Sequence, residues 1–293
     1  MNSNSEQAPI GEAWGISGHK SGDCLILSGN YKDFSISEVI SKDESILGKK
    51  MKEMPIQIRM LDSKDDLSIQ VHPSQFYAKT YSNDNGKNEC WYIIDCEENA
   101  TLVYGHEFLT KEDLKNAILE NKIMDFLNYL PIKKGDLVYV PTGLIHAMTK
   151  NITAIEISDS SDITYRVYDY DRIDKNGNKR ELHLEKSLDV IDVPCKYPYI
   201  NEHIDIGNGF FNKILLDNEI FFISSLKVLK SCKLEKSHPY YACFVIKGEA
   251  FLNGIKVKKG DFFILTTLEK NLVIEGEVEI LLSYSKNNEG GVD

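Results

Sequence analysis

Two segments far apart in the chain share one pattern and constrain the fold more than any other feature of the sequence. Residues 133–142 read KKGDLVYVPT and residues 258–267 read KKGDFFILTT. In each, a turn containing Gly-Asp leads into apolar residues, which is typical of a strand that follows a tight turn. The repetition predicts a duplicated β-unit. Because other short strand-like runs are also separated by Gly turns, we predict a mainly β chain that folds as a β-sandwich or as jelly-roll barrels.

One stretch departs from this β pattern. The segment 110–130 begins with a Thr/Asp cap and keeps helical spacing, with a break near Asn121. We interpret residues 185–205, which contain two prolines, as a linker. We therefore predict a domain of residues 1–195, with a small helical insertion around 110–130, and a second domain of residues 196–293.

Composition narrows the class of function. A net charge of -11 repels nucleic acid and anionic membranes, so we predict neither as a partner. The 6 cysteines include no Cys-x-x-Cys pair, which argues against a zinc ribbon and a disulfide scaffold. The first residues lack the pattern of a signal peptide, and no apolar run is long enough for a membrane span. We expect a cytoplasmic protein that is a monomer or a homodimer.

A candidate metal site begins at Gln70-Val71-His72. In a strand, residues two apart point to the same side, so Gln70 and His72 face one way and Val71 the other. Glu89 follows after a long loop. An amide oxygen, an imidazole and a carboxylate together form a donor set that suits a divalent metal ion.

A second histidine is expected from His146. It ends the pattern Gly135-x5-Pro141-x4-His146, in which Gly and Pro shape the turns around one strand. This pattern resembles the second motif of the cupin family, and the Gln70 to Glu89 stretch resembles the first. Two neutral imidazoles and one carboxylate leave a divalent ion one positive charge, which favours zinc, although iron or manganese also accepts these ligands. No His follows the second copy of the repeat, so we expect no second metal site.

Between residues 11 and 193 the chain resembles the type I mannose-6-phosphate isomerases of the short bacterial form. The resemblance rests on GEAWGIS, DLSIQVHP, GKNECWYIID, YGH, GDLVYVPTGLIHA, SDITYRVYDYDR and ELHLEKSLDVID. It implies a double cupin of two β jelly-roll barrels with one Zn²⁺ per chain. It also implies a phosphosugar substrate, with mannose 6-phosphate and fructose 6-phosphate interconverted by an aldose–ketose isomerase through a cis-enediol.

The same resemblance assigns roles to residues. It implies the zinc ligands Gln70, His72, Glu89 and His146. It implies the catalytic residues Arg166, Lys87 and Glu156. For substrate binding it implies Ser68, Arg59, Arg172, Asp162 and Trp14, with the two arginines as partners of the phosphate.

Each assignment has a plainer alternative. Lys87 could be a solvated charge at a loop tip, and Arg166 could form a structural ion pair with Asp169 or Asp171. For the whole chain, the alternatives are an iron-dependent cupin dioxygenase and a non-catalytic cupin that binds sugar phosphate. In the C-terminal part we predict nothing catalytic and expect His238 at the surface.

Overall fold

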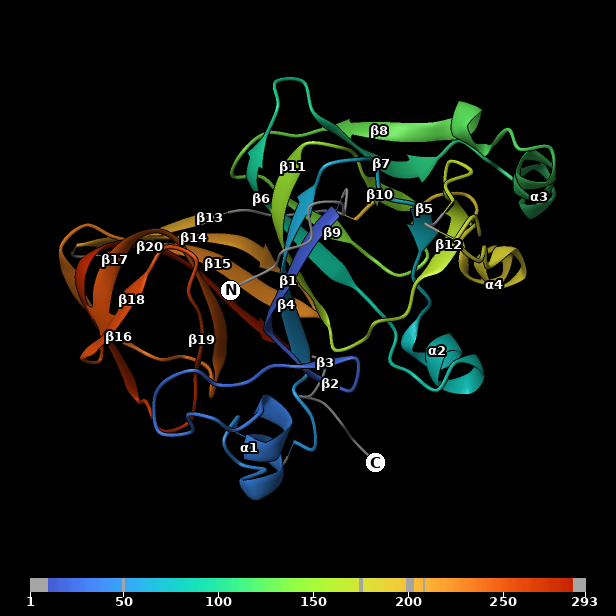
Figure 1. Cartoon of the computed structure of the whole chain (residues 1–293). Coiled ribbons are helices and arrows are strands. Elements are labelled where there is room, and N and C mark those ends of the chain that lie inside the picture. The colour runs from blue at the N-terminus through green and yellow to red at the C-terminus, as the bar shows by residue number, and fades with distance from the viewer. Residues whose placement is uncertain (1–9, 49–50, 174–175, 199–202, 208, 287–293) are drawn as a thin grey trace. The chain divides into compact units, whose positions relative to one another are not determined.

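The computed structural model describes residues 10–48, 51–173, 176–198, 203–207 and 209–286, and strands dominate it (Figure 1). The mainly β prediction is confirmed. The chain divides into two compact units, one of Met1–Ala13 with Arg59–Tyr199 and one of Trp14–Ile58 with Ile200–Asp293. Residues 14–58, which we placed in the first domain, thus group with the C-terminal segment. Within the described part of the chain, no helix has the length and apolar character needed to cross a membrane.

Two five-stranded sheets position the residues of the candidate site. The order of the first sheet is β1 (Ile10–Ile16), β4 (Ile56–Ser63), β11 (Ile152–Asp159), β6 (Glu89–Cys96) and β9 (Leu137–Val140). The order of the second is β12 (Tyr165–Tyr168), β5 (Ile69–Val71), β10 (His146–Met148), β7 (Thr101–His106) and β8 (Leu127–Pro131).

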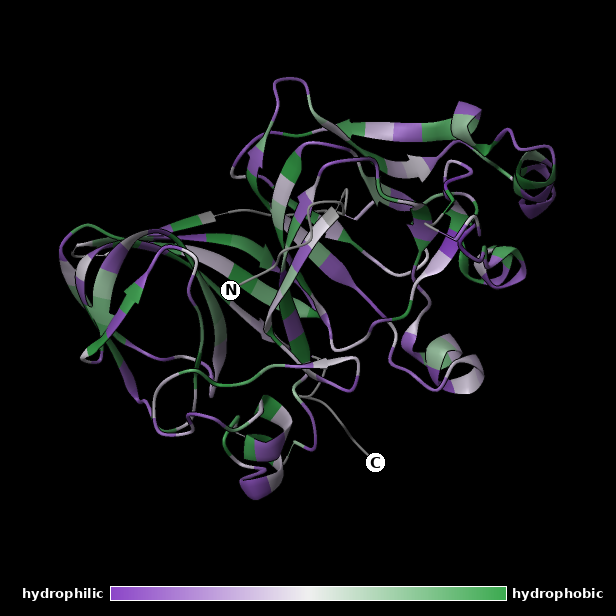
Figure 2. Ribbon diagram, viewed as in Figure 1, coloured by the Kyte–Doolittle hydropathy of each residue, from purple (hydrophilic) through white to green (hydrophobic). Residues whose placement is uncertain are grey.

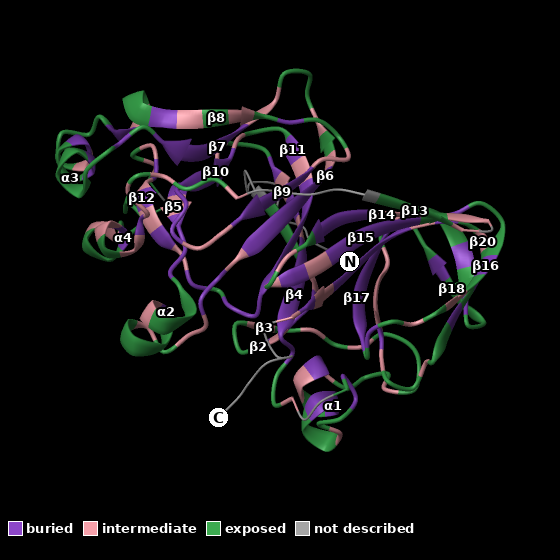
Figure 3. Ribbon diagram, turned by 180° about the vertical axis from the view of Figure 1, so that it is seen from behind, coloured by how far each residue is buried: buried purple, intermediate pink, exposed green. Residues whose placement is uncertain are grey.

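A hydrophobic core joins the facing sides of these sheets. Trp91 and Ile93 of β6 are buried and belong to the same cluster as Met148 of β10 and Leu102 of β7. Alternate residues along each strand point into this core, as the period of two requires. The green apolar positions in Figure 2 and the purple buried strands in Figure 3 follow these sheets.

Short helices cover the other face of the second sheet. Ile69 and Val71 of β5 pack in one cluster with Ala78 of α2 (Gln75–Tyr81) and Leu114 of α3 (Lys111–Leu119). Thr110 caps α3, because its hydroxyl accepts from the backbone N–H of Asp113. The expected helix is shorter than 110–130. After α3 come the 3₁₀-helix η1 (Ile123–Phe126) and then β8, which pairs with β7 and is therefore held as a strand.

The linker predicted at 185–205 carries regular structure. It contains most of α4 (Leu184–Val190) and the start of β13 (His203–Gly207). The side chains of α4 reach the cluster that covers the second sheet, because Leu188 and Val190 pack against it. Burial of these apolar side chains thus stabilises a helix that the nearby prolines do not disrupt.

The second unit contains an eight-stranded sheet. Its main path is β13, β14 (Phe210–Asp217), β15 (Phe221–Val228), β20 (Asn271–Ser285), β17 (Tyr241–Leu252) and β18 (Ile255–Lys258). In addition, β16 (Ser231–Glu235) pairs with β20 and β19 (Phe262–Leu265) pairs with β17. Also in this unit are the short β2 (Gly18–His19) and β3 (Gly22–Asp23), and the helix α1 (Ile36–Lys42). The expectation that His238 lies at the surface is wrong, since it is buried and stacks on Tyr284.

The duplicated turn predicted from the sequence is present in both units. Gly135 and Gly260 have φ of 88° and 90°, a conformation that glycine adopts without steric cost. The backbone N–H of Lys133 donates to the Asp136 carboxylate at 2.9 Å. The same bond joins Lys258 and Asp261 at 2.8 Å.

The strands that follow the two turns also pair in the same way. Val140, at the end of β9, lies opposite Glu89 of β6. Leu265, at the end of β19, lies opposite Tyr241 of β17. Tyr241 in the second unit therefore occupies the position that Glu89 occupies in the first.

Candidate metal centre and active site

Three neighbouring strands of the second sheet bring three polar side chains into one row. Gln70 on the central strand β5 pairs with His146 on β10 and with Arg166 on β12. Residues directly opposite each other in paired strands share a face. Since Ile69 and Val71 pack on the helix-covered face, the row faces the first sheet.

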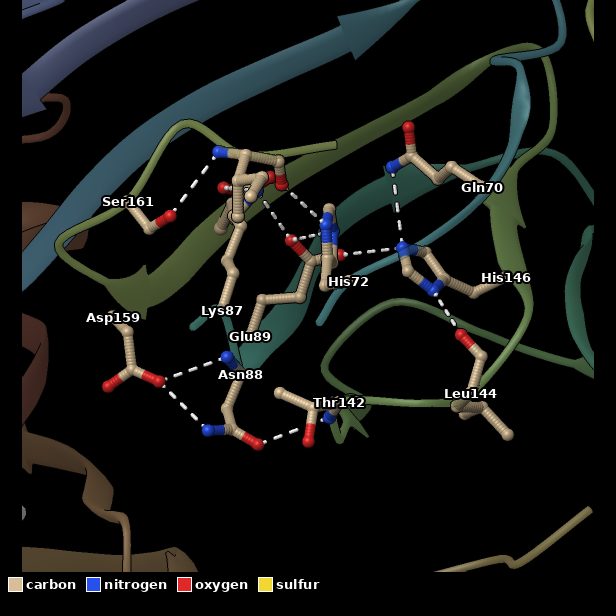
Figure 4. A network of polar contacts seen from close by, with 12 residues as sticks. Gln70, His72, Lys87, Asn88, Glu89, Thr142, Leu144, His146, Asp159 and Ser161 are labelled. Atoms are coloured by element: carbon tan, nitrogen blue, oxygen red, sulfur yellow. Dashed lines mark hydrogen bonds and ion pairs between the residues drawn. The ribbon is translucent and has the colours of Figure 1, made fainter. Parts of the chain in front are cut away.

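Glu89 reaches this row from the first sheet. Its Oε1 lies 3.3 Å from Nε2 of His146, and its Oε2 lies 3.3 Å from Nε2 of His72 (Figure 4). One ligand atom from each of these three residues lies within 4.8 Å of the others, and all three side chains are buried. Side chains from the two sheets thus converge on one point.

Backbone carbonyls orient both histidines. The Nδ1–H of His72 donates to the carbonyl of Ile163 at 2.8 Å, and that of His146 donates to the carbonyl of Leu144 at 2.8 Å. Burial, followed by the nearby ammonium of Lys87, lowers the pKa of His72 to about 4. The imidazole of His72 is therefore neutral near pH 7, with the lone pair of Nε2 directed at Glu89.

Unsatisfied polar atoms mark this point as a fit for a metal ion. Nε2 of His72 and Oε1 of Glu89 are buried and make no hydrogen bond with the described residues, and Oε2 of Glu89 is approached by the ammonium of Lys87 as an ion pair. Burial by itself would raise the pKa of Glu89, but Lys87 and then His72 hold it well below its usual value. Two imidazole nitrogens and an ionised carboxylate match the ligands of a divalent ion.

Gln70 is placed to complete the donor set. Its Nε2 lies 3.3 Å from Nε2 of His146. Because the oxygen and nitrogen of an amide are assigned from their surroundings, a half-turn of this amide puts Oε1 at the same place. Gln70 therefore offers an oxygen ligand in the rotated orientation.

Lys87 lies between two buried carboxylates. Its Nζ is 2.8 Å from Oε2 of Glu89 and 3.1 Å from Oε1 of Glu156, and the residue is 3% exposed. The alternative of a solvated charge at a loop tip is therefore wrong. The ammonium reduces the repulsion between these two carboxylates, which lie beside the histidines.

Arg59 is a second cation that contacts Glu156. It donates from Nε to Glu156 at 3.1 Å and from Nη1 to Glu12 at 3.0 Å, and Nη1 lies 3.5 Å from Asp162. Burial alone would raise the pKa of Glu156, but Arg59 and Lys87 lower it, so the carboxylate is ionised. The guanidinium of Arg59 thus contacts carboxylates within the protein, and its role in phosphate binding stays a prediction.

Comparison with known proteins decides the family. Residues 1–102 match the family model "Phosphomannose isomerase type I, catalytic domain", and residues 213–285 match "Mannose-6-phosphate isomerase, cupin domain". A mannose-6-phosphate isomerase of Bacillus subtilis is 36% identical over 280 residues, which cover 94% of this chain and 89% of the relative. The chain belongs to the type I phosphomannose isomerase family. It is therefore an isomerase, and the dioxygenase and non-catalytic alternatives fall away.

Other relatives agree with this assignment. A mannose-6-phosphate isomerase of Streptococcus mutans is 35% identical over 94% of this isomerase and 88% of the relative. The crystal structure of the Bacillus subtilis mannose 6-phosphate isomerase superposes with a TM-score of 0.90 at 35% identity, over 94% of this chain and 89% of that chain. A protein of Archaeoglobus fulgidus, 18% identical over 97% and 90% of the two chains, shares the fold with a TM-score of 0.74. The predicted cupin fold is confirmed.

Arg166 is a cation of this isomerase with no ion pair among the described residues. Its Nε is buried and makes no hydrogen bond within the part of the chain that the structure describes. Asp169 is instead taken by Arg172 and Arg180. The structure thus argues against the ion-pair alternative for Arg166. Its backbone N–H donates to Nδ1 of His183 at 3.1 Å, which fixes this part of β12.

The remaining predicted substrate residues are placed differently. Ser68 is buried just before β5. Arg172 donates to the carbonyls of Asp66 and Asp169 and to the Asp169 carboxylate, so its donors are occupied within the protein. Trp14 belongs to the second unit, where a Cβ on Gly22 would come within 2.6 Å of its indole. The substrate roles of these residues stay predictions.

Two residues that the sequence did not single out support the centre. The backbone N–H and the Nδ2 group of Asn88 both donate to Oδ2 of Asp159, each at 2.9 Å (Figure 4). Oδ1 of Asn88 accepts from the backbone N–H of Thr142 at 3.2 Å. Asn88 stands between Lys87 and Glu89, but its contacts lie far away in sequence, so only the fold reveals them.

Proposed function

We propose that the chain is a zinc-dependent isomerase that interconverts mannose 6-phosphate and fructose 6-phosphate. The observation that carries the proposal is the convergence of His72, Glu89 and His146, in which Nε2 of each histidine lies 3.3 Å from a carboxylate oxygen of Glu89. The substrate is taken from the relatives that carry the name mannose-6-phosphate isomerase.

The zinc ion would be held by Gln70, His72, Glu89 and His146, with one ion per chain. When bound, the ion supplies a positive charge that polarises the sugar carbonyl and lowers the energy of the enediolate. The carbonyls of Ile163 and Leu144 keep the two imidazoles in the tautomer that offers Nε2 as a ligand.

Glu156 is our candidate for the base. Isomerisation requires one proton to move between C1 and C2 through a cis-enediol, so one group has to take the proton and return it. Glu156 is buried and ionised, and Lys87 connects it to the ligand Glu89. A positioned base contributes about 10² to 10⁴-fold to the rate.

Arg166 is our candidate for stabilising the enediolate. It stands in the same row as Gln70 and His146 and makes no ion pair with a described residue, so its positive charge is available to a ligand. Fixed positive charge beside a developing oxyanion stabilises the transition state more than the ground state. Lys87 would hold the carboxylates of Glu89 and Glu156 in place.

A coupled assay tests the proposal. Mannose 6-phosphate is supplied, and formation of fructose 6-phosphate is followed before and after removal of metal by a chelator. We expect activity to be lost on chelation and restored by zinc, at a measured stoichiometry near one ion per chain. Full activity in protein shown to be free of metal would exclude the zinc mechanism, while no activity with zinc bound would exclude the substrate.

A further inference from the structure

The second unit contains a cavity of about 260 Å³ that no step of the proposed function uses. Strands β14, β15 and β20 and residues near β16, β17 and β19 surround it. Its lining includes no histidine or cysteine. A metal centre like that of the first unit is therefore not what this cavity holds.

The cavity lies at the position in the second unit that corresponds to the metal centre. Tyr241 and Leu265 line it, and they are paired across β17 and β19. Glu89 and Val140 are paired in the same way after the first copy of the repeated turn. The duplication has thus kept a hollow at this place and replaced the ligand carboxylate by a tyrosine, whose hydroxyl lies 2.7 Å from Oγ of Ser237.

Two of the residues that line this cavity carry a buried polar atom without a partner among the described residues. Oγ of Ser224, a residue with 0% exposure, and Oδ1 of Asn212 make no hydrogen bond with the described residues. Buried polar groups are nearly always satisfied, so these atoms call for a ligand with hydroxyl groups. Phe210 and Phe222 supply apolar surface beside them, against which the C–H face of a sugar ring packs.

Charge disfavours a phosphate in this cavity. The only cationic side chain among the lining residues is Lys236, and its Nζ already donates to the carbonyls of Pro239 and Thr266. Asp205 and Glu235 add two carboxylates to the lining. A phosphorylated sugar would meet two negative charges and a cation whose hydrogen bonds are taken.

We propose that this cavity is a binding site for a neutral monosaccharide. Its volume lies just below the roughly 300 Å³ at which pockets for drug-sized ligands begin, so one sugar ring suits it better than an oligosaccharide. Ser224 and Asn212 bind the sugar hydroxyls, and Phe210 and Phe222 pack against the ring. The site is separate from the metal centre, because all its residues belong to the second unit.

Isothermal titration calorimetry of the full, zinc-loaded chain with methyl α-mannopyranoside tests this site. The probe has no phosphate, and its ring cannot open, so isomerisation does not interfere. We expect saturable binding with a Kd in the millimolar range. Loss of one hydrogen bond in Ser224→Ala should weaken binding about tenfold. Ser225→Ala is the matched control, since Ser225 points to the opposite face of β15 and donates to Glu279, and its Kd should be unchanged.

Two further arms complete the test. Arg166→Ala should bind the probe as the unaltered chain does, because Arg166 belongs to the other site. Asn212→Leu replaces Ser224→Ala if circular dichroism shows that the latter does not fold, and the same loss of affinity is expected. Absence of saturable binding at millimolar probe would overturn the proposal. So would binding that disappears in Arg166→Ala and persists in both cavity variants.

Discussion

Asn88 and Asp159 are joined by three hydrogen bonds. The backbone N–H and the Nδ2 group of Asn88 donate to Oδ2 of Asp159, and the backbone N–H of Asp159 donates to the carbonyl of Asn88 at 3.0 Å. Asn88 lies between Lys87 and Glu89 in the chain. The pair therefore fixes the backbone from which the ammonium and the ligand carboxylate extend.

Replacing Asn88 by Ala should weaken zinc binding. The variant loses the side-chain bonds to Asp159 and Thr142 and keeps the two backbone bonds to Asp159, so Glu89 is less well held against His146. Loss of such outer contacts typically reduces metal affinity by about 10 to 100-fold. Competition with a chelator measures the zinc Kd, and Asn85→Ala, which removes a bond to the carbonyl of Ser160 and none to Asp159, is the comparison. Equal zinc affinity in Asn88→Ala and the unaltered chain would contradict this role.

Gly86→Ala should also disturb the segment that carries Lys87 and Glu89, because Gly86 directly precedes Lys87 in the chain. A Cβ at Gly86 would lie 2.3 Å from the backbone nitrogen of Gln75 and 2.6 Å from the carbonyl carbon of Ser74, so the backbone has to move. Overpacking of this kind costs about 1–3 kcal/mol. Urea denaturation measures the free energy of unfolding. Gly11→Ala is the matched control, because its nearest neighbour would be Cβ of Asp62 at 3.6 Å. Equal losses in the two variants would show that the close approach at Gly86 is not limiting.

His72→Ala should abolish zinc binding, because it removes one of the two imidazole ligands. His106→Ala is the control, since His106 is also buried in the first unit but bonds to the carbonyl of Asp192. Metal analysis of the purified proteins should find about one zinc ion per chain in the control and almost none in His72→Ala. A full complement of zinc in His72→Ala would remove this residue from the ligand set.

Arg166→Ala should lower kcat and leave the zinc content unchanged. The side chain contributes positive charge to the enediolate but no metal ligand, and loss of one such group costs about 10² to 10³-fold in kcat. Arg180→Ala is the control for a general effect of removing a positive charge. Arg180 follows Arg166 in the chain but forms an ion pair with Asp169. Near-normal turnover in Arg166→Ala, measured in the coupled assay at saturating substrate, would refute the assignment.

Asp169→Asn should make the chain less stable near pH 7. Burial alone would raise the pKa of Asp169, but hydrogen bonds from Arg180 and Arg172 lower it. A carboxylate with a depressed native pKa stabilises the fold above the unfolded pKa of about 3.9, and this contribution is lost as the pH falls through the native pKa. We expect a loss of about 2 kcal/mol near pH 7. In urea denaturation the difference between the two chains should shrink below about pH 4, and a constant difference would rule out the ionised carboxylate as its source.

The sequence by itself indicated the residues of the candidate metal centre and the duplication. The period of two along a strand sets Gln70 and His72 on one side, and the repeated Gly-Asp turns set the strands that follow them. Both are local properties, because they depend on residues that are close neighbours in the chain. The capping box at Ser35 and Glu38 is of the same kind, and the structure contains it.

Only the tertiary structure decided what surrounds those residues. Lys87 looks like a loop charge in sequence, yet pairing of β6 with β11 buries it beside Glu156. Arg59 bonds to the carboxylate of Glu156, which lies 97 positions away in the sequence. No local pattern could therefore distinguish this ion pair from phosphate binding. Residues 14–58 likewise group with a segment that begins at residue 200. The packing of the whole core selects which strands pair. The residues next to Lys87 and Arg59 in the sequence do not specify those partners.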